Sequence, residues 1–372
     1  MTLSNPKHLL HRRSPGGRRP RSVWFGTLAM LGCVAVLHAA TTQVQAQARA
    51  PELRFGGQVP IEVDEFYEAG LAWLAQQQGS DGRWSDGQSG PGVNGLCIMA
   101  FLASGEDPNF GRYAPVIRRA LRALLLDQEQ ETGYFPSSMY HHGFAMLALA
   151  EAYGVVDERL IWQDSGETGE GQQSQSIAVA LERAVQLAVS SQSNNRFGAW
   201  RYSPQSQDAD TSVAGAVIMG LLAARNAGLE VPQESIDTAL EYMRSNTSRD
   251  GTVAYSGGMG MGESMNRSAI AALVASVGRQ TNTWHYTATR DYLTSRLDHN
   301  EAGHYVDYFR YYMAQALFQA DYESWQTWNA SVIRRLESVR SADGSFNGNS
   351  YSTAMSLLTL ALNYRFLPVY ER

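Results

Sequence analysis

Carboxylates are the residues of this chain best suited to chemistry, and they stand where long uncharged segments begin: Asp208, Asp210, Glu263 and Asp307. Two carboxylates held across a groove are the groups that cleave glycosidic bonds. An aspartate directly before a helix is also the ordinary N-cap, and Thr211 and Ser212 follow Asp210. Both interpretations stay open: Asp210 and Asp208 are candidate catalytic residues, and Asp210 is predicted to cap a helix that begins at Thr211 or Ser212.

Histidines and tyrosines supply the remaining candidates. His141 and His142 are adjacent, so they point to different faces of a helix and do not easily bind one ion. No metal and no cofactor is therefore expected, and His142 joins the candidate catalytic residues. Tyrosines near residue 310 suit a pocket for an apolar or cationic guest, although ordinary packing explains them as well. The candidate ligand-binding residues are Tyr140, His141, Tyr305, Tyr308, Tyr312 and Trp200.

A repeated unit must position these residues. The unit consists of an amphipathic segment, a glycine turn with an aromatic residue, and a nearly uncharged segment. It recurs about six times, roughly 40 to 65 residues apart. Such spacing is typical of repeats that bury their apolar faces only by stacking on one another. The glycine and aromatic pairs are Gly82 with Trp84, Gly133 with Tyr134, Gly198 with Trp200, Gly251 with Tyr255, Gly303 with Tyr305, and Gly344 with Phe346.

The charge pattern separates two kinds of helix. The first segment of each unit carries a charged face, whereas the second segments have no charge over 93–104, 143–150, 212–224, 268–278 and 352–363. A helix that is apolar all round is buried on every side, and one with a charged face lies against solvent. The pattern predicts an all-α protein, an α/α toroid of about twelve helices in two rings, and disfavours an open solenoid.

The N-terminal residues resemble an export signal. Six Lys and Arg residues and no acid precede residue 22, and an apolar run covers 23–40. Cleavage after Ala48 is favoured, and the alternative is a membrane anchor formed by residues 23–40. The expected organisation is a signal peptide or anchor at 1–48 and one toroid domain at 49–372, with a polar loop at 157–176. We expect a periplasmic or extracellular protein.

Net charge and cysteine content exclude one class of partner and one kind of cross-link. Cleavage takes the formal net charge from −6 to −12, which argues against nucleic acid, because binding to phosphates needs clustered Lys and Arg. Cleavage also removes Cys33 and leaves only Cys97, so no intramolecular disulfide is expected. The membrane is expected as a partner only through an uncleaved N-terminal segment.

The segments 77–84 and 340–346 resemble the glutamine-to-tryptophan repeats of squalene and hopene cyclases and of protein prenyltransferase beta subunits. The resemblance covers residues 60 to 370 and is strongest for the bacterial prenyltransferase/squalene-oxidase repeat proteins. It implies six inner and six outer helices around a largely apolar central cavity.

The catalytic motifs of these relatives are incomplete here. The cyclase motif Asp-x-Asp-Asp-Thr, whose acid protonates an alkene, is matched only by residues 208–212, with one acid missing. The prenyltransferase zinc site needs an acid two residues before its cysteine, and Gly95 stands there before Cys97. The expectation is therefore a toroid that binds an apolar ligand or a protein partner in or near its cavity without such chemistry. The alternatives are an enzyme acting on an isoprenoid through Asp210, or on a glycan through paired carboxylates.

Overall fold

The computed structural model describes residues 59–163, 175–256, 264–299 and 305–368. Residues Val59–Arg372 form one compact unit. The expected export segment, Glu263 and most of the polar loop lie outside the described residues. No helix in the described ranges combines the length and the hydropathy that crossing a bilayer requires.

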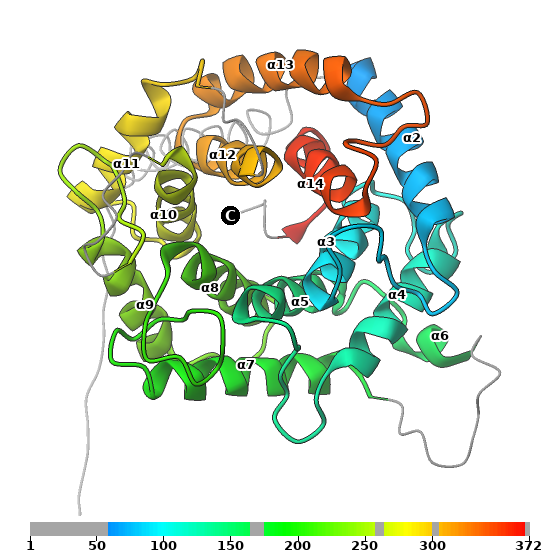
Figure 1. The fold of residues 1–372 in the computed structure, drawn as a ribbon, viewed down its shortest axis with the longest axis horizontal. Coiled ribbons are helices and arrows are strands. Elements are labelled where there is room, and N and C mark those ends of the chain that lie inside the picture. Colours follow the sequence, from blue (N-terminus) through cyan, green and yellow to red (C-terminus); the bar gives the residue numbers. More distant parts are fainter. Residues whose placement is uncertain (1–58, 164–174, 257–263, 300–304, 369–372) are drawn as a thin grey trace, which may run out of the picture. The chain divides into compact units, whose positions relative to one another are not determined.

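The fold is an α/α toroid, as predicted, with two concentric rings of helices (Figure 1). The described residues include six inner and six outer helices. The inner helices are α3 (Pro91–Leu102), α5 (Met139–Ala152), α8 (Thr211–Asn226), α10 (Met265–Val277), α12 (Val306–Ala320) and α14 (Ser350–Leu360). The outer helices are α2 (Ile61–Gln77), α4 (Ala114–Asp127), α7 (Ile177–Ser193), α9 (Gln233–Ser245), α11 (Trp284–Thr294) and α13 (Tyr322–Val339).

Burial follows the charge pattern of the sequence. Every residue of α3 is buried, whereas α4 buries one face and exposes the other. The predicted polar loop at 157–176 differs from expectation, because it contains a short helix, α6 (Glu158–Gln163), whose Ile161 is fully buried. A 3-10 turn, Ala361–Asn363, follows α14.

Glutamine side chains tie successive outer helices together. In three units a glutamine near the end of one outer helix donates hydrogen bonds to the carbonyl of the turn glycine and to a carbonyl in the first turn of the next outer helix. The three sets are Gln78 with Gly82 and Val116, Gln128 with Gly133 and Ala180, and Gln192 with Gly198 and Ser235, at 2.8 to 3.2 Å. The repeat in the sequence thus corresponds to a repeated polar contact.

The last unit closes the ring against the first. Inner helix α14 packs on α3 and α12, and outer helix α13 packs on α2. The Tyr67 hydroxyl donates to the Leu357 carbonyl at 2.8 Å. Gly344 has a φ of 92°, and a Cβ at this position would lie 2.7 Å from the carbonyl oxygen of Ala69. Only glycine fits both this left-handed backbone and this close approach. The open solenoid is therefore excluded.

Candidate functional site

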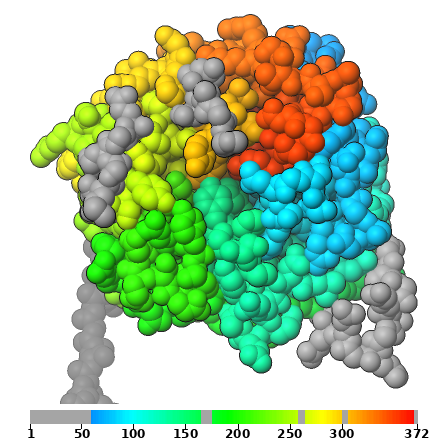
Figure 2. All heavy atoms as spheres, in the orientation of Figure 1, coloured from blue at the N-terminus to red at the C-terminus, as the bar shows by residue number. Residues whose placement is uncertain are grey.

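A cavity of 470 Å³ lies where the inner helices begin, at the end of the ring that we call the mouth. This first cavity is bordered by the N-terminal ends of α5, α8, α10, α12 and α14. On the face shown in Figure 2, segments far apart in the sequence meet around the centre. The volume is typical of small-molecule sites.

Six tyrosines line the first cavity, together with hydrogen-bonding side chains. Tyr202 and Tyr305 are more than half exposed and lie at the rim, whereas Tyr308 is buried. Burial raises the pKa of Tyr308, so its phenol stays protonated. The tyrosines are Tyr140, Tyr202, Tyr255, Tyr305, Tyr308 and Tyr351, and the polar and charged residues are Gln88, Asp210, Ser212, Ser264, Asn266 and Arg267.

Asp210 occupies the wall of this cavity and caps α8, which confirms the predicted cap. Its Oδ1 accepts hydrogen bonds from the backbone N–H groups of Ser212 at 2.7 Å and Val213 at 3.1 Å. Its Oδ2 lies 3.5 Å from the Tyr202 hydroxyl. The two oxygens therefore have different surroundings, because one holds the helix end and the other faces the phenols.

Tyr202 and Tyr255 form a hydrogen-bonded pair beside Asp210. Their hydroxyl oxygens are 2.9 Å apart. Burial, followed by hydrogen bonding to Asp210 and Tyr202, raises the pKa of Tyr255. The Tyr255 phenol therefore keeps its proton near neutral pH and is suited to donate a hydrogen bond to the Asp210 carboxylate or to a ligand.

Asp208, a predicted catalytic residue, forms an ion pair with Arg201 and does not line the first cavity. Although partial burial opposes it, the Ala209 N–H group, the Ser256 hydroxyl and Arg201 together lower the pKa of Asp208. Arg201 in turn lies over the ring of Tyr255, 5.6 Å from its centroid. Asp208 thus contacts the tyrosine pair only indirectly, through Arg201, from outside the cavity.

The histidines and Trp200 make contacts within the protein. The Nδ1 of His142 accepts from the Phe135 N–H group at 3.2 Å, and its Nε2 donates to the Ala184 carbonyl at 3.0 Å. Both ring nitrogens are occupied and the side chain is fully buried, so this position gives no support to the predicted catalytic role. His141 accepts from the Gly92 N–H group, and the Trp200 indole donates to the Ala188 carbonyl. None of the three lines the first cavity.

The predicted tyrosines divide between the cavity lining and the residues packed behind it. Tyr140, Tyr305 and Tyr308 line the cavity. Tyr312 is fully buried, with its ring 4.7 Å from Tyr308 and 4.9 Å from Tyr311. Tyr312 therefore packs behind the lining residue Tyr308 and does not line the cavity itself.

Sequence reasoning missed Tyr202, Tyr255, Tyr351 and Arg267 as lining residues. Tyr255 is the aromatic residue of the fourth turn, and Tyr351 stands where the last uncharged segment begins, so a search for aromatic residues at these recurring positions could have found both. Tyr202 and Arg267 carry no comparable signal.

A second cavity of 500 Å³ adjoins the first at the mouth. Gln88 and Tyr351 border both cavities. Asp307, in the first turn of α12, lines the second cavity and is 6% exposed. Asp210 and Asp307 thus border different cavities at the mouth.

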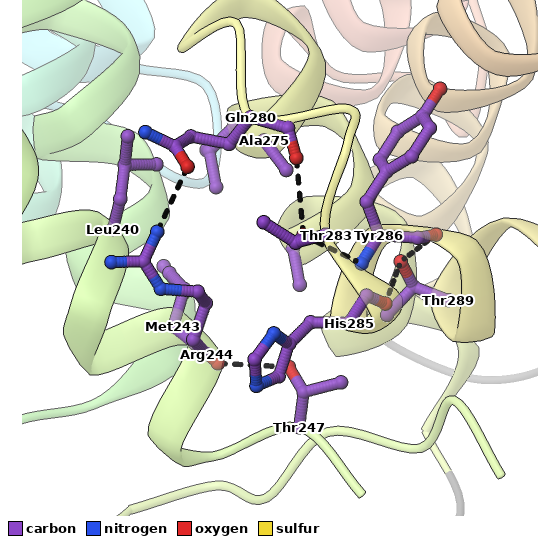
Figure 3. Close-up of a pocket in the computed structure, with 12 residues that line it drawn as sticks. Leu240, Met243, Arg244, Thr247, Ala275, Gln280, Thr283, His285, Tyr286 and Thr289 are labelled. Atoms are coloured by element: carbon purple, nitrogen blue, oxygen red, sulfur yellow. Dashed lines mark hydrogen bonds between the residues drawn. The ribbon is translucent and has the colours of Figure 1, made fainter. Parts of the chain in front are cut away.

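A third pocket, in the outer layer between α9, α10 and α11, is much smaller (Figure 3). Its volume of 20 Å³ has room for about one water molecule. Arg244 donates to the Gln280 side chain across it, and His285 points into it. Elsewhere too, no three His, Cys, Asp or Glu side chains of the described ranges gather as metal ligands would.

No protein-family model and no curated protein sequence matches this chain. Solved structures share the fold at low identity. An α-1,6-mannanase of Salegentibacter sp. HEL1_6 is 12% identical, with a TM-score of 0.58 over 81% of this chain and 98% of that chain. The cellobiose 2-epimerase of Bacillus thermoamylovorans is 12% identical, with a TM-score of 0.57 over 80% and 98%. A protein from Actinoplanes is 14% identical, with a TM-score of 0.52 over 81% and 99%. These similarities establish the α/α toroid.

Proposed function

We propose that the mouth of the toroid binds a carbohydrate and that Asp210 is the proton-transferring residue of the site. The observation that carries the proposal is the lining of the first cavity, with six tyrosines interspersed with amide, hydroxyl and carboxylate groups. Tyrosine offers an apolar ring face and a polar hydroxyl, and a sugar presents the same two kinds of surface. The mannanase and the epimerase, which share the fold, act on sugars and support this choice.

The exposed rim and the polar lining of the cavity favour a sugar over an isoprenoid. Protonation of an alkene needs a dry, closed pocket, whereas rim residues Tyr202 and Tyr305 are exposed and Gln88 and Asn266 add polar groups to the wall. Glycoside hydrolysis uses a carboxyl group that gives a proton to the leaving oxygen, and Asp210 would supply that group. In that reaction the Asp210 Oδ2, beside the Tyr202 hydroxyl, is the oxygen we assign to proton transfer.

The test is a panel of sugars offered to the purified full chain. Isothermal titration calorimetry would measure binding of mannose, glucose and xylose and of α-1,6-manno-, cello- and xylotetraose, and anion-exchange chromatography would detect cleavage. We expect binding by at least one series, weakened by Tyr305→Ala at the rim and unchanged by the control Tyr322→Ala on outer helix α13. Absence of binding throughout, or equal losses in both variants, would overturn the proposal.

An apolar ligand is the second candidate, because Tyr140 and Tyr308 in the lining pack against each other with ring centroids 5.7 Å apart. Native mass spectrometry of the purified protein distinguishes the two, since a retained lipid would favour the apolar ligand. Export through residues 1–48 belongs to the same proposal. Membership in the prenyltransferase/squalene-oxidase repeat group is also proposed, and the three glutamine tethers support it.

A further inference from the structure

Asp307, which lines the second cavity, has one buried carboxylate oxygen without a hydrogen-bond partner in the described part of the chain. Asp307 Oδ2 accepts a hydrogen bond from Asn347 Nδ2 at 3.3 Å. Its Oδ1 has no hydrogen-bond partner among the described residues. A guanidinium nitrogen of Arg310 lies 3.8 Å from Oδ1, within ion-pair range but too far for a hydrogen bond. A buried acceptor without a hydrogen bond is costly, so a group from outside the protein is expected to satisfy it.

The surroundings of Asp307 hold this side chain in place. Asn347 has a φ of 54°, in the left-handed region that asparagine tolerates, and its amide also donates to the Ser352 hydroxyl at 3.4 Å. Asn349 donates to the Asn347 carbonyl at 3.1 Å. Asn347, Asn349 and Ser352 line the same cavity as Asp307. Three hydrogen-bonding side chains and a buried carboxylate thus converge on one empty space.

The two cavities share a boundary, which determines what a ligand in both must look like. Gln88 and Tyr351 line each of them. A single sugar ring fills one cavity, whereas an oligosaccharide crossing the boundary places successive rings in the two.

We infer that the second cavity is a second sugar subsite, in which Asp307 Oδ1 accepts a hydrogen bond from a ligand hydroxyl, so that the ligand is an oligosaccharide of at least two units. The inference rests on the proposed carbohydrate function and adds to it the size of the ligand and a specificity-determining residue. Asp210 transfers the proton in the first cavity, and Asp307 binds the neighbouring sugar unit in the second.

The experiment compares short and long sugars on the full chain. Calorimetric affinities of the best-binding monosaccharide of the panel and of its tetrasaccharide are measured for the native protein and for Asp307→Asn. We expect the tetrasaccharide to bind more tightly than the monosaccharide. Asp307→Asn should weaken the tetrasaccharide about tenfold or more, because hydrogen bonds to charged groups exceed neutral ones in strength, while monosaccharide affinity stays the same.

Asn347→Gly supplies a second variant in case Asp307→Asn does not fold with Arg310 left unpaired. Glycine accepts the positive φ at this position, and the substitution removes the side-chain amide that donates to Asp307 and Ser352. The same selective loss for the tetrasaccharide is expected. Equal affinity for both sugars, or variants that weaken both sugars alike, would overturn the subsite and leave the carbohydrate function standing. Absence of any sugar binding would overturn both.

Discussion

Asp210 can be tested as a cap and as a functional acid separately, because its two side-chain oxygens have different tasks. Asp210→Ala removes the acceptor of two backbone N–H groups, those of Ser212 and Val213. Loss of an N-cap costs about 1 kcal/mol, and burial of the freed donors moves this toward about 2 kcal/mol. Asp210→Asn keeps an acceptor oxygen for the cap. It loses the attraction between the carboxylate and the helix dipole, about 0.5 kcal/mol, and the long contact with the Tyr202 hydroxyl.

Urea unfolding followed by circular dichroism measures these differences. The expected order of unfolding free energy is native, then Asp210→Asn, then Asp210→Ala. Asp321 is a matched control, since it caps outer helix α13 by accepting from the Ser324 N–H group at 2.8 Å and lies away from the mouth. Asp321→Ala should cost about 1 kcal/mol and leave sugar binding unchanged.

The functional half of the prediction concerns the charge. Asp210→Asn should abolish turnover of any cleaved tetrasaccharide of the panel while most of the stability is kept. Full activity in a stable Asp210→Asn protein would refute the acid role and reduce Asp210 to a cap. Destabilisation by Asn as large as that by Ala would refute the assignment of Oδ1 as the capping atom.

Three further predictions concern the ring and its core. Gln192→Ala removes two hydrogen bonds to backbone carbonyls and should lower the free energy of unfolding in urea by about 2 kcal/mol. Gln186→Ala, on the exposed side of α7, should cause almost no change. Gly344→Ala should lower the free energy of unfolding by more than about 2 kcal/mol. The control is Gly348→Ala, which should cost about 1 kcal/mol, because Gly348 has a φ of 63° and no atom within 4 Å of the added Cβ. Equal losses in the two variants would contradict the close contact at Gly344. Burial lowers the pKa of His142 to about 4, so the unfolded chain takes up a proton below pH 6.5 that the folded chain refuses. The contribution of neutral His142 to the free energy of unfolding is therefore complete above pH 6.5 and falls by up to about 3 kcal/mol as the pH drops to 4. Between pH 7 and pH 4.5, His142→Gln should lose less unfolding free energy than the native protein. Identical losses in the two proteins would refute this origin.

The two rings of helices were predictable because the charge pattern of the sequence indicates which helices are buried. The uncharged run at 93–104 leaves a helix no face for solvent, and the structure buries every residue of α3. Helix α6 was missed because its six residues stand in a segment dominated by Gln, Gly and Ser, where composition hides a short apolar contact such as that of Ile161.

The site was predictable only in part. Parallel inner helices bring their first residues to one mouth, so Asp210, Tyr140 and Tyr308 could be chosen from sequence position alone. The direction in which a side chain points could not be predicted in the same way. His142 follows His141 by one residue, and that rotation sends its ring to the Ala184 carbonyl of the outer layer. The unpaired Asp307 oxygen depends on Asn347, forty residues further along the chain, and no local pattern reports it.

Closure of the ring changes how this chain can fold and vary. An open array of repeats protects its ends with polar capping units and can gain or lose a copy. Here the first and last pairs protect each other through contacts such as that of Tyr67 with Leu357, 290 positions apart. Such distant pairing slows folding and makes it all-or-none, because removal of one pair exposes uncharged helices on both sides of the gap. Evolution of this protein should therefore proceed through its turns, where Tyr202 and Tyr255 lie, with the number of pairs held constant.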